Sequence, residues 1–410
     1  MVYDRSVIDA ALDITAEVRQ RRPASNGGGG HRADNVPECF WKSVRLNAKG
    51  GVVVFEPMGG GMCSGLDMAL RSGLRVTKYV YCDTDAEMRK IAKFRVNALS
   101  KAYPTLFPPS SHASAFDAVP QDVYAVTEDD LLKVGAADPE VAAWLTVCGW
   151  QCQDLSPAGR REGLNGSRSK TFFPLVRMLD AIARIRRERR LCPPVYIVEN
   201  TAFQTYCTGS VEGDVAVYRD FTAVCAVLGR PVVVDAARFG SGAHRLRNFW
   251  SDLFSDVSSM QGLLDRVKRP DDAPNAQDLL DPGRTVRISN ADDNFPFYPV
   301  NQIGYPVRVF PTFVQKVKSW NFTPGQNGAV NTGKRRRSRR AQEEDEPNAS
   351  ERERCMGYPT GCTNSPDMCP EISEKVRRSA VSRGMDANTL DFLFRASERM
   401  TMTTTMTEVW

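Results

Sequence analysis

Three separated segments of the chain carry side chains suited to nucleophilic chemistry. Cys152 lies in the loop-like stretch QCQDLSPAG, Glu199 lies in VENTA, and Arg245 and Arg247 lie in HRLRNFW. A thiolate can add to a substrate and later leave, a carboxylic acid can transfer a proton, and a guanidinium can hold an oxygen or a phosphate. Each residue also has an ordinary explanation, namely packing, helix capping or surface charge, so the case depends on whether the fold brings the set together.

A glycine-rich loop follows the first strongly apolar run of the sequence. The stretch EPMGGGMCSG contains Gly59, Gly60 and Gly61, which permit a tight turn and the close approach of a ligand. Asp83 ends the next apolar run, where its carboxylate could accept hydrogen bonds from ribose hydroxyls. The pattern predicts half of a nucleoside-cofactor site, with a merely tight turn as the alternative, because its glycine spacing is one residue longer than the dinucleotide fingerprint.

The elements that position these motifs are short runs rich in β-branched and aromatic residues. The runs that predict buried strands span 51–56, 77–83, 142–149, 194–200 and 229–237. Helical spacing occurs between them, as at 84–103 and 171–190. Alternating strands and helices indicate right-handed crossovers and a mainly parallel sheet, in which ligands bind beyond the carboxyl ends of the strands.

Composition limits the classes of protein to consider. The 410 residues suffice for one sizeable α/β core and a smaller second unit. No apolar stretch is long enough to span a bilayer, and the first residues lack the apolar centre of a signal peptide. Eleven scattered cysteines favour free thiols in a reducing compartment, and a net charge of +5 permits a polyanionic partner without requiring one.

Taken in order, the motifs resemble those of the cytosine-5 DNA methyltransferases, from about residue 52 to 397. FEPMGGG resembles the family's Phe-x-Gly-x-Gly-Gly cofactor loop, YCD its strand-end acid, PQDVYAV its third motif, and QCQDLSPAG its catalytic Pro-Cys loop. VENTA resembles the Glu-Asn-Val motif, HRLRNFW the arginine motif, and ERERCMGY and SRGMDANTLDFLF the last two motifs. AHRLRNFW and SRGMDANTL are most similar to the eukaryotic de novo branch and its retroelement-associated relatives.

The resemblance implies a Rossmann-like, S-adenosylmethionine-dependent methyltransferase fold, with a mixed, mainly parallel sheet and helices on both faces. It divides the chain into an N-terminal extension with a glycine-rich linker (1–50), a catalytic domain (51–253), a target-recognition region with a basic run (254–350), and C-terminal motifs that complete the catalytic domain before a frayed tail (351–410). The expected partner is double-stranded DNA, the expected location is the nucleus, and no membrane is expected to be involved. Homo- or hetero-oligomerisation through the methyltransferase domain is a further expectation.

The resemblance also implies a role for each site residue. Cys152 would add to carbon-6 of a flipped-out cytosine, Glu199 would hold or protonate ring N3, and Arg247 would hold O2 or a phosphate while Arg245 supports the loop. S-adenosylmethionine would supply the methyl group to carbon-5. The residues expected to bind this cofactor are Phe55, Met58, Gly59, Gly60, Gly61, Asp83, Thr84, Asp122 and Val123. The residues expected to shape the substrate loop are Gln151, Gln153, Ser156 and Asn200, and no metal ligands are expected.

The chain departs from the family pattern at several positions, which leaves two alternatives open. Gln151 stands where the family has proline, Pro57 replaces a glycine, Asp83 replaces the commoner glutamate, and Thr201 replaces a valine. One alternative is an RNA (tRNA) cytosine-5 methyltransferase, although the Cys-Phe-Thr tripeptide of the tRNA-type branch is missing. The other is a catalytically weak regulatory or DNA-binding homologue. The sequence favours an active DNA (cytosine-5) methyltransferase.

Overall fold

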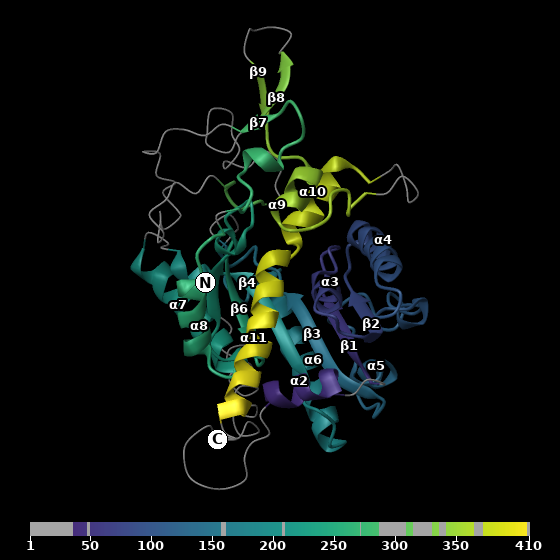
Figure 1. Cartoon of the computed structure of the whole chain (residues 1–410). Coiled ribbons are helices and arrows are strands. Elements are labelled where there is room, and N and C mark those ends of the chain that lie inside the picture. Colours follow the sequence, from purple (N-terminus) through teal and green to yellow (C-terminus); the bar gives the residue numbers. More distant parts are fainter. Residues whose placement is uncertain are drawn as a thin grey trace.

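A six-stranded sheet forms the centre of the molecule (Figure 1). This computed structural model describes residues 36–46, 50–156, 161–206, 210–270, 272–286, 309–314, 330–335, 342–364 and 372–407. The sheet order is β2-β1-β3-β4-β6-β5. The strands are β1 (Gly51–Pro57), β2 (Val76–Cys82), β3 (Val141–Gly149), β4 (Val195–Thr201), β5 (Val232–Asp235) and β6 (Leu246–Ser251).

The directions of the strands make the sheet mixed but mainly parallel. β1 pairs in parallel with β2 and β3, and β3 pairs in parallel with β4. β6 runs antiparallel to both β4 and β5. The five apolar runs of the sequence therefore form β1 to β5 as predicted, and the sixth strand lies within the arginine motif.

Side chains that alternate along the strands divide the core into two layers. On β1, Val52 and Val54 join one hydrophobic cluster, whereas Val53 and Phe55 join another on the opposite face. The first face is covered by α2 (Val36–Leu46), α3 (Ser64–Arg71), α4 (Ala86–Ala102), α8 (Val257–Arg266) and α11 (Ala387–Thr407). The second is covered by α5 (Glu128–Lys133), α6 (Phe172–Glu188) and α7 (Val211–Leu228). The fold is Rossmann-like α/β, and the predicted fold class is confirmed.

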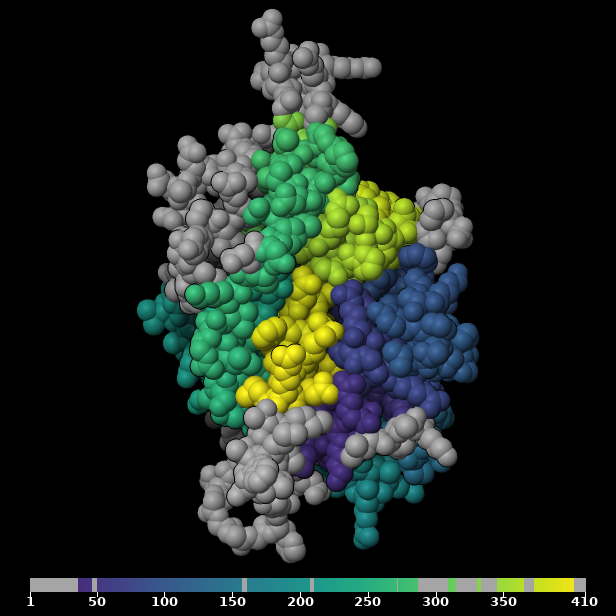
Figure 2. Space-filling model, viewed as in Figure 1, coloured from purple at the N-terminus to yellow at the C-terminus, as the bar shows by residue number. Residues whose placement is uncertain are grey.

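The described chain begins with a helix that belongs to the main core. Phe40 and Trp41 of α2 are fully buried, and the Trp41 ring lies 4.7 Å from that of Phe394 on α11. Figure 2 shows α11 at the surface between the segment around α8 and the segment that carries α2 and α3. The core thus takes in residues from the predicted N-terminal extension, while the predicted glycine-rich linker lies outside the described residues.

The region predicted for target recognition is described only in part. It contains α8 and a small sheet of order β7-β8-β9 that lies apart from the main sheet (Figure 1). Its strands are β7 (Thr285–Val286), β8 (Val330–Arg335) and β9 (Gln342–Asp345). Most of the basic run falls outside the described residues. In the part of the chain that is described, no helix has the length and hydropathy of a membrane span.

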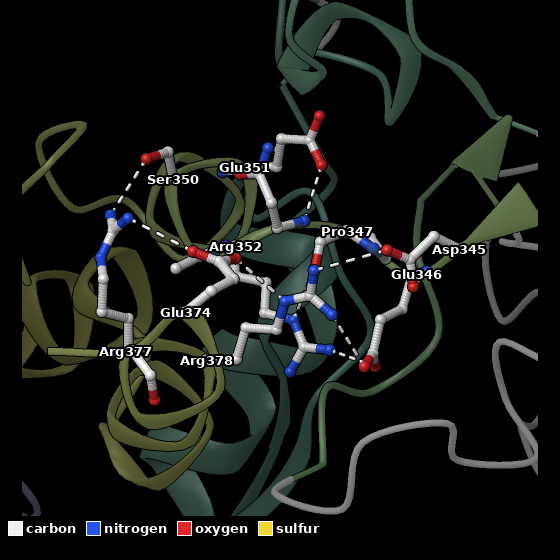
Figure 3. Close-up of polar contacts among 12 residues, drawn as sticks. Asp345, Glu346, Pro347, Ser350, Glu351, Arg352, Glu374, Arg377 and Arg378 are labelled. Carbon is white, nitrogen blue, oxygen red and sulfur yellow. Dashed lines mark hydrogen bonds and ion pairs between the residues drawn. The ribbon is translucent and has the colours of Figure 1, made fainter. Parts of the chain in front are cut away.

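A network of buried ion pairs joins β9 to α9 (Ala349–Cys355) and α10 (Glu374–Arg383), as Figure 3 shows. We call it the α9–α10 network. Its pairs are Glu346–Arg352 at 2.5 Å, Glu346–Arg378 at 2.9 Å, Glu374–Arg378 at 3.0 Å, and Glu353–Arg377 and Glu374–Arg377, each at 3.3 Å. Asp345, the last residue of β9, lies 3.7 Å from Arg378 and adds a fourth acid to the three glutamates and three arginines. The network holds the C-terminal helices against the chain that leads out of the small sheet.

Candidate active site

Three neighbouring strands bring the thiol, the acid and the two arginines to one edge of the sheet. Gly149 at the end of β3 pairs with Glu199 on β4, and Thr201 on β4 pairs with Arg247 on β6. Cys152 follows β3 directly, in the loop after Gly149. The convergence expected from the sequence is therefore present.

Ion pairs and electrostatic interactions join these residues into a compact group, which we call the Cys152 cluster. Oε1 of Glu199 lies 3.2 Å from Nη2 of Arg245 and 3.0 Å from Nε of Arg247. Glu199 and Arg245 are 7% and 6% exposed, so both charges are largely removed from water. Cys152 is half-buried and interacts electrostatically with all three.

Electrostatic interactions decide the protonation of the thiol in the Cys152 cluster. Two guanidiniums face the Glu199 carboxylate, and the buried carboxyl of Asp386 also interacts with Arg245. Burial raises the pKa of Cys152, and the Glu199 carboxylate raises it further. The positive charges of Arg247 and Arg245 lower it, and the net shift is upward. Burial also lowers the pKa of Arg245. The resting thiol is therefore protonated, and the arginines stabilise the thiolate as it forms.

The loop around Cys152 is a tight turn fastened to the segment before α6. The carbonyl oxygen of Cys152 accepts hydrogen bonds from the N–H groups of Leu155 (3.0 Å) and Ser156 (2.8 Å). The buried carboxylate of Asp154 accepts from the backbone N–H of Arg168 (2.8 Å) and of the next residue (2.9 Å). Asp154 therefore positions the turn, a role that the sequence analysis did not assign.

Two residues predicted for the substrate loop also fix its backbone. The N–H of Gln151 donates to Oγ1 of Thr171 (3.4 Å), and its carbonyl accepts from Oγ of Ser169 (2.9 Å). Proline could not make the first of these bonds, because it has no N–H. Asn200 is buried and donates through Nδ2 to the carbonyl of Trp150 (3.0 Å), which ties β4 to the chain just before the thiol.

A pocket adjoins the Cys152 cluster on the side of the glycine-rich loop. Its walls come from the end of β1, the loop, α3, the end of β3, β4 and the turn between α10 and α11. The lining residues are Glu56, Met58, Gly59, Ser64, Gly65, Val147, Cys148, Gly149, Glu199, Arg383, Gly384 and Met385. Because Glu199 belongs to both, a molecule in this pocket would lie beside whatever occupies the Cys152 cluster.

The glycine-rich loop turns through the left-handed region. Gly60 and Gly61 have φ of 65° and 94°, which glycine adopts easily, and Met58 has φ of 58°, which is uncommon for a residue with a side chain. The N–H of Met58 donates to the carbonyl of Cys82 (2.6 Å), and the N–H of Gly60 donates to Oδ2 of Asp83 (3.0 Å). The loop is thus fastened to the end of β2.

The other residues predicted to bind the cofactor lie around this loop in two settings. Asp83 is half-buried, which raises its pKa, whereas Thr84 and Asp122 are exposed. Phe55 and Val123 are buried in the hydrophobic cluster on the α5–α6 face and do not line the pocket. The two acids also lie outside the pocket lining, and the two apolar residues belong to the core beneath the strands.

Two charged residues of the pocket, Glu56 and Arg383, were not selected from the sequence. Glu56 is 2% exposed and accepts hydrogen bonds from the N–H of Leu66 (2.9 Å) and the hydroxyl of Tyr79 (2.7 Å); burial raises its pKa to about 7. Nη1 of Arg383 lies 2.8 Å from Oδ2 of Asp85. Glu56 could have been noticed because it stands at the end of the first predicted strand, but Arg383 comes from a distant part of the chain.

Several buried polar atoms in this area have no hydrogen-bond partner within the described ranges. They are Nε1 of Trp150, Oε1 of Gln153, Nε of Arg245 and Nε of Arg383. Such atoms usually bind water or a ligand, since leaving them unpaired costs free energy. These four atoms are therefore available to water or to a ligand bound at this site.

Comparisons with known proteins find structural likeness but no close relative. No family model matches the sequence, and no curated protein is matched. Similar solved structures are the Dnmt2 methyltransferase of S. pombe (14% identity, 84% of this chain and 97% of that chain, TM-score 0.48) and the methyltransferase EhMeth of Entamoeba histolytica (10%, 85% and 98%, 0.46). A mutant DNMT2 of Spodoptera frugiperda is also similar (12%, 85% and 99%, 0.42). Identities this low do not carry an activity over to this chain.

Proposed function

We propose that the protein is an S-adenosylmethionine-dependent methyltransferase that acts on carbon-5 of cytosine in double-stranded DNA. The observation that carries the proposal is the Cys152 cluster at the edge of a glycine-lined pocket. A thiol, an acid and two guanidiniums are the groups that this reaction needs, and the order of the sequence motifs supports the same conclusion. We therefore assign the chemistry to Cys152, Glu199, Arg245 and Arg247.

The reaction requires a nucleophile that can both add and leave. Carbon-5 of cytosine is a poor nucleophile until a group adds to carbon-6, and the thiolate of Cys152 is suited to that addition. Glu199 shares a proton with ring N3 while negative charge develops on the ring, and Arg247 donates a hydrogen bond to O2. After methyl transfer, loss of the carbon-5 proton returns electrons to the ring, and the bond from carbon-6 to Cys152 breaks.

The residues of the pocket fit the proposed cofactor. Gly59 and Gly65 line the pocket, and Glu56 and Arg383 offer it a carboxyl group and a guanidinium, which suit the ammonium and carboxylate of an amino-acid group. Asp83 and Asp122 offer acceptors for the hydroxyl and amino groups of an adenosine. When bound, S-adenosylmethionine supplies the methyl group as an electrophile. Because Glu199 lines the pocket and also interacts with Cys152, the protein can hold the cofactor next to the target cytosine.

DNA as the substrate and the nucleus as the location are parts of this proposal, supported by the sequence motifs and by the mild positive charge of +5. The target base must leave the helix, because a stacked cytosine cannot reach Cys152. The region 254–350 is proposed to contact the DNA. Association of two methyltransferase domains is proposed as well.

The test is methyl transfer from labelled S-adenosylmethionine to DNA duplexes with cytosines in varied contexts and to transfer RNA. We expect 5-methyldeoxycytidine in the digested DNA, none with Cys152→Ala, and normal amounts with Cys225→Ala, a matched control on α7. Product in RNA alone would replace the DNA part of the proposal and keep the chemistry. No product with either nucleic acid, from protein that still binds the cofactor, would overturn the enzymatic proposal in favour of a regulatory homologue.

A further inference from the structure

Two thiols far apart in sequence lie in contact near the amino end of β4, opposite the end of this strand that carries the Cys152 cluster. Cys39 on α2 and Cys192, in the connection between α6 and β4, have their Sγ atoms 3.1 Å apart, with 153 positions between them along the chain. Both side chains are half-buried, so a small molecule can reach them. A disulfide bond is roughly 2 Å long, so a closure of about 1 Å would join them.

The surroundings of this pair favour thiolate chemistry. Arg186 is fully buried; its Nε donates to the carbonyl of Cys192 (2.6 Å), and its charge interacts with both sulfurs. The groups that oppose this charge are the two thiols and Asp138, and no ion pair of Arg186 occurs among the described residues. Ser43, one turn after Cys39, forms a hydrogen bond with Cys192. The contact with Cys39 and burial raise the pKa of Cys192, and the guanidinium lowers it.

We propose that Cys39 and Cys192 form a redox-active dithiol, which small disulfides such as oxidised glutathione convert to an intramolecular disulfide. The thiolate of Cys39 attacks one glutathione sulfur, the glutathione disulfide breaks, and one glutathione thiolate leaves. The proton of Cys192 passes to that thiolate, and the sulfur of Cys192 attacks Cys39 and displaces the second glutathione. Two protein thiols are oxidised, and one glutathione disulfide is reduced to two glutathione thiols.

Several groups around Cys192 act on its pKa. The hydrogen bond with Cys39 and burial raise the pKa of Cys192 above that of an ordinary thiol, whereas Ser43 lowers it. Loss of the Ser43 hydroxyl, whose hydrogen bond lowers the pKa of Cys192, should slow the second step.

The disulfide would fasten α2, which carries Phe40 and Trp41 into the core, to the start of β4. Since the cross-link closes a very long loop, it restricts the unfolded chain and stabilises the fold. Cys192 precedes the amino end of β4, whereas Glu199 lies near its carboxyl end. The modification should therefore change stability without changing the chemistry, and it does not depend on the proposed methyl transfer.

The experiment exposes the full-length protein to glutathione buffers of increasing oxidation and maps disulfide-linked peptides by mass spectrometry without reduction. We expect one peptide pair that contains Cys39 and Cys192, its reversal by dithiothreitol, and a thermal midpoint about 5 °C higher in the oxidised form. Ser43→Ala should form the same pair a few-fold more slowly. The matched control Cys225→Ala should behave like the unchanged protein.

Cys39→Ala and Cys192→Ala should each lose both the linked peptides and the rise in thermal midpoint. Glutathione attached separately to the two cysteines, with no linked peptide, would overturn the proposal. The proposal would also be overturned if the linked pair formed but the thermal midpoint did not rise in either the parent protein or Cys225→Ala. The disulfide would then not stabilise the fold.

Discussion

The Cys152 cluster and the α9–α10 network both bury arginines against glutamates, yet they differ in what else the arginines face. In each, one buried glutamate contacts two arginines: Glu199 contacts Arg245 and Arg247, and Glu346 contacts Arg352 and Arg378. In the α9–α10 network the arginines face further acids, whereas in the Cys152 cluster both arginines also interact with a thiol. Paired charges alone stabilise a fold, while arginines beside a thiol can also stabilise an anion that forms during a reaction.

The largest expected effect comes from removing the thiol. Cys152→Ala deletes the nucleophile and leaves the charges as they are, so methyl transfer should fall by about 10⁴-fold or more while the thermal midpoint changes little. Turnover is measured with labelled S-adenosylmethionine. A variant that retained a tenth of the activity would show that Cys152 is not the nucleophile.

The two central glutamates provide a matched pair of variants. Glu199→Gln should lower kcat by roughly 10²–10⁴-fold, because the ring nitrogen loses its proton partner. Glu346→Gln should destabilise the fold by about 3–5 kcal/mol through the loss of buried ion pairs, and should leave the activity of the folded fraction unchanged. Denaturant unfolding and turnover per folded molecule measure the two effects.

The comparison fails if the two variants behave alike. Equal losses of kcat would mean that the α9–α10 network takes part in catalysis. Equal losses of stability with full activity would mean that the Cys152 cluster is only structural.

A steric change tests the position of Glu199 without altering any charge. A Cβ at Gly149 would lie 2.9 Å from the carbonyl oxygen of Glu199 and 3.2 Å from its Oε2, so Gly149→Ala must displace the acid. We expect about a 10-fold loss of turnover, since small misplacements of catalytic groups are costly. Gly262→Ala on α8 is the matched control and should keep full activity, because the nearest atom outside the helix backbone is the flexible end of Arg266 at 3.8 Å. Equal activity in both variants would show that Glu199 need not occupy its observed position.

The smallest expected effect is a shift in the pH dependence of thiol reactivity. Burial raises the pKa of Cys152 and Arg247 lowers it, so Arg247→Gln should raise it further. Only the thiolate reacts with iodoacetamide, and a higher pKa leaves less thiolate at a given pH. At pH 7.5 alkylation of Cys152 should therefore slow several-fold in Arg247→Gln, and the rise in rate should move to higher pH. Arg378→Gln should leave the profile unchanged; an unshifted profile in Arg247→Gln would remove the electrostatic argument.

The sequence predicted the parts of the site that depend on local pattern. β-branched runs predicted five strands, and the motifs after them predicted that Cys152, Glu199 and Arg247 would meet, because parallel strands end at one edge. The antiparallel direction of β6 was not predictable, since side-chain periodicity carries no direction.

Contacts between distant segments account for what the sequence analysis missed. Arg383 meets Asp85 across 298 positions of the chain, and no local pattern indicates such a pair. Asp154 appears in the sequence only as one polar residue of a loop, and its role depends on the backbone near Arg168. Long-range packing, and not propensity, decided these positions.

The most direct test of the account is covalent trapping on a DNA duplex that carries 5-fluorocytosine, whose fluorine cannot leave as a proton does. In the presence of S-adenosylmethionine, we predict a stable protein–DNA adduct whose linked peptide contains Cys152 and whose base carries a methyl group. An adduct through another residue, or none in any sequence context from protein that binds both DNA and the cofactor, would contradict it.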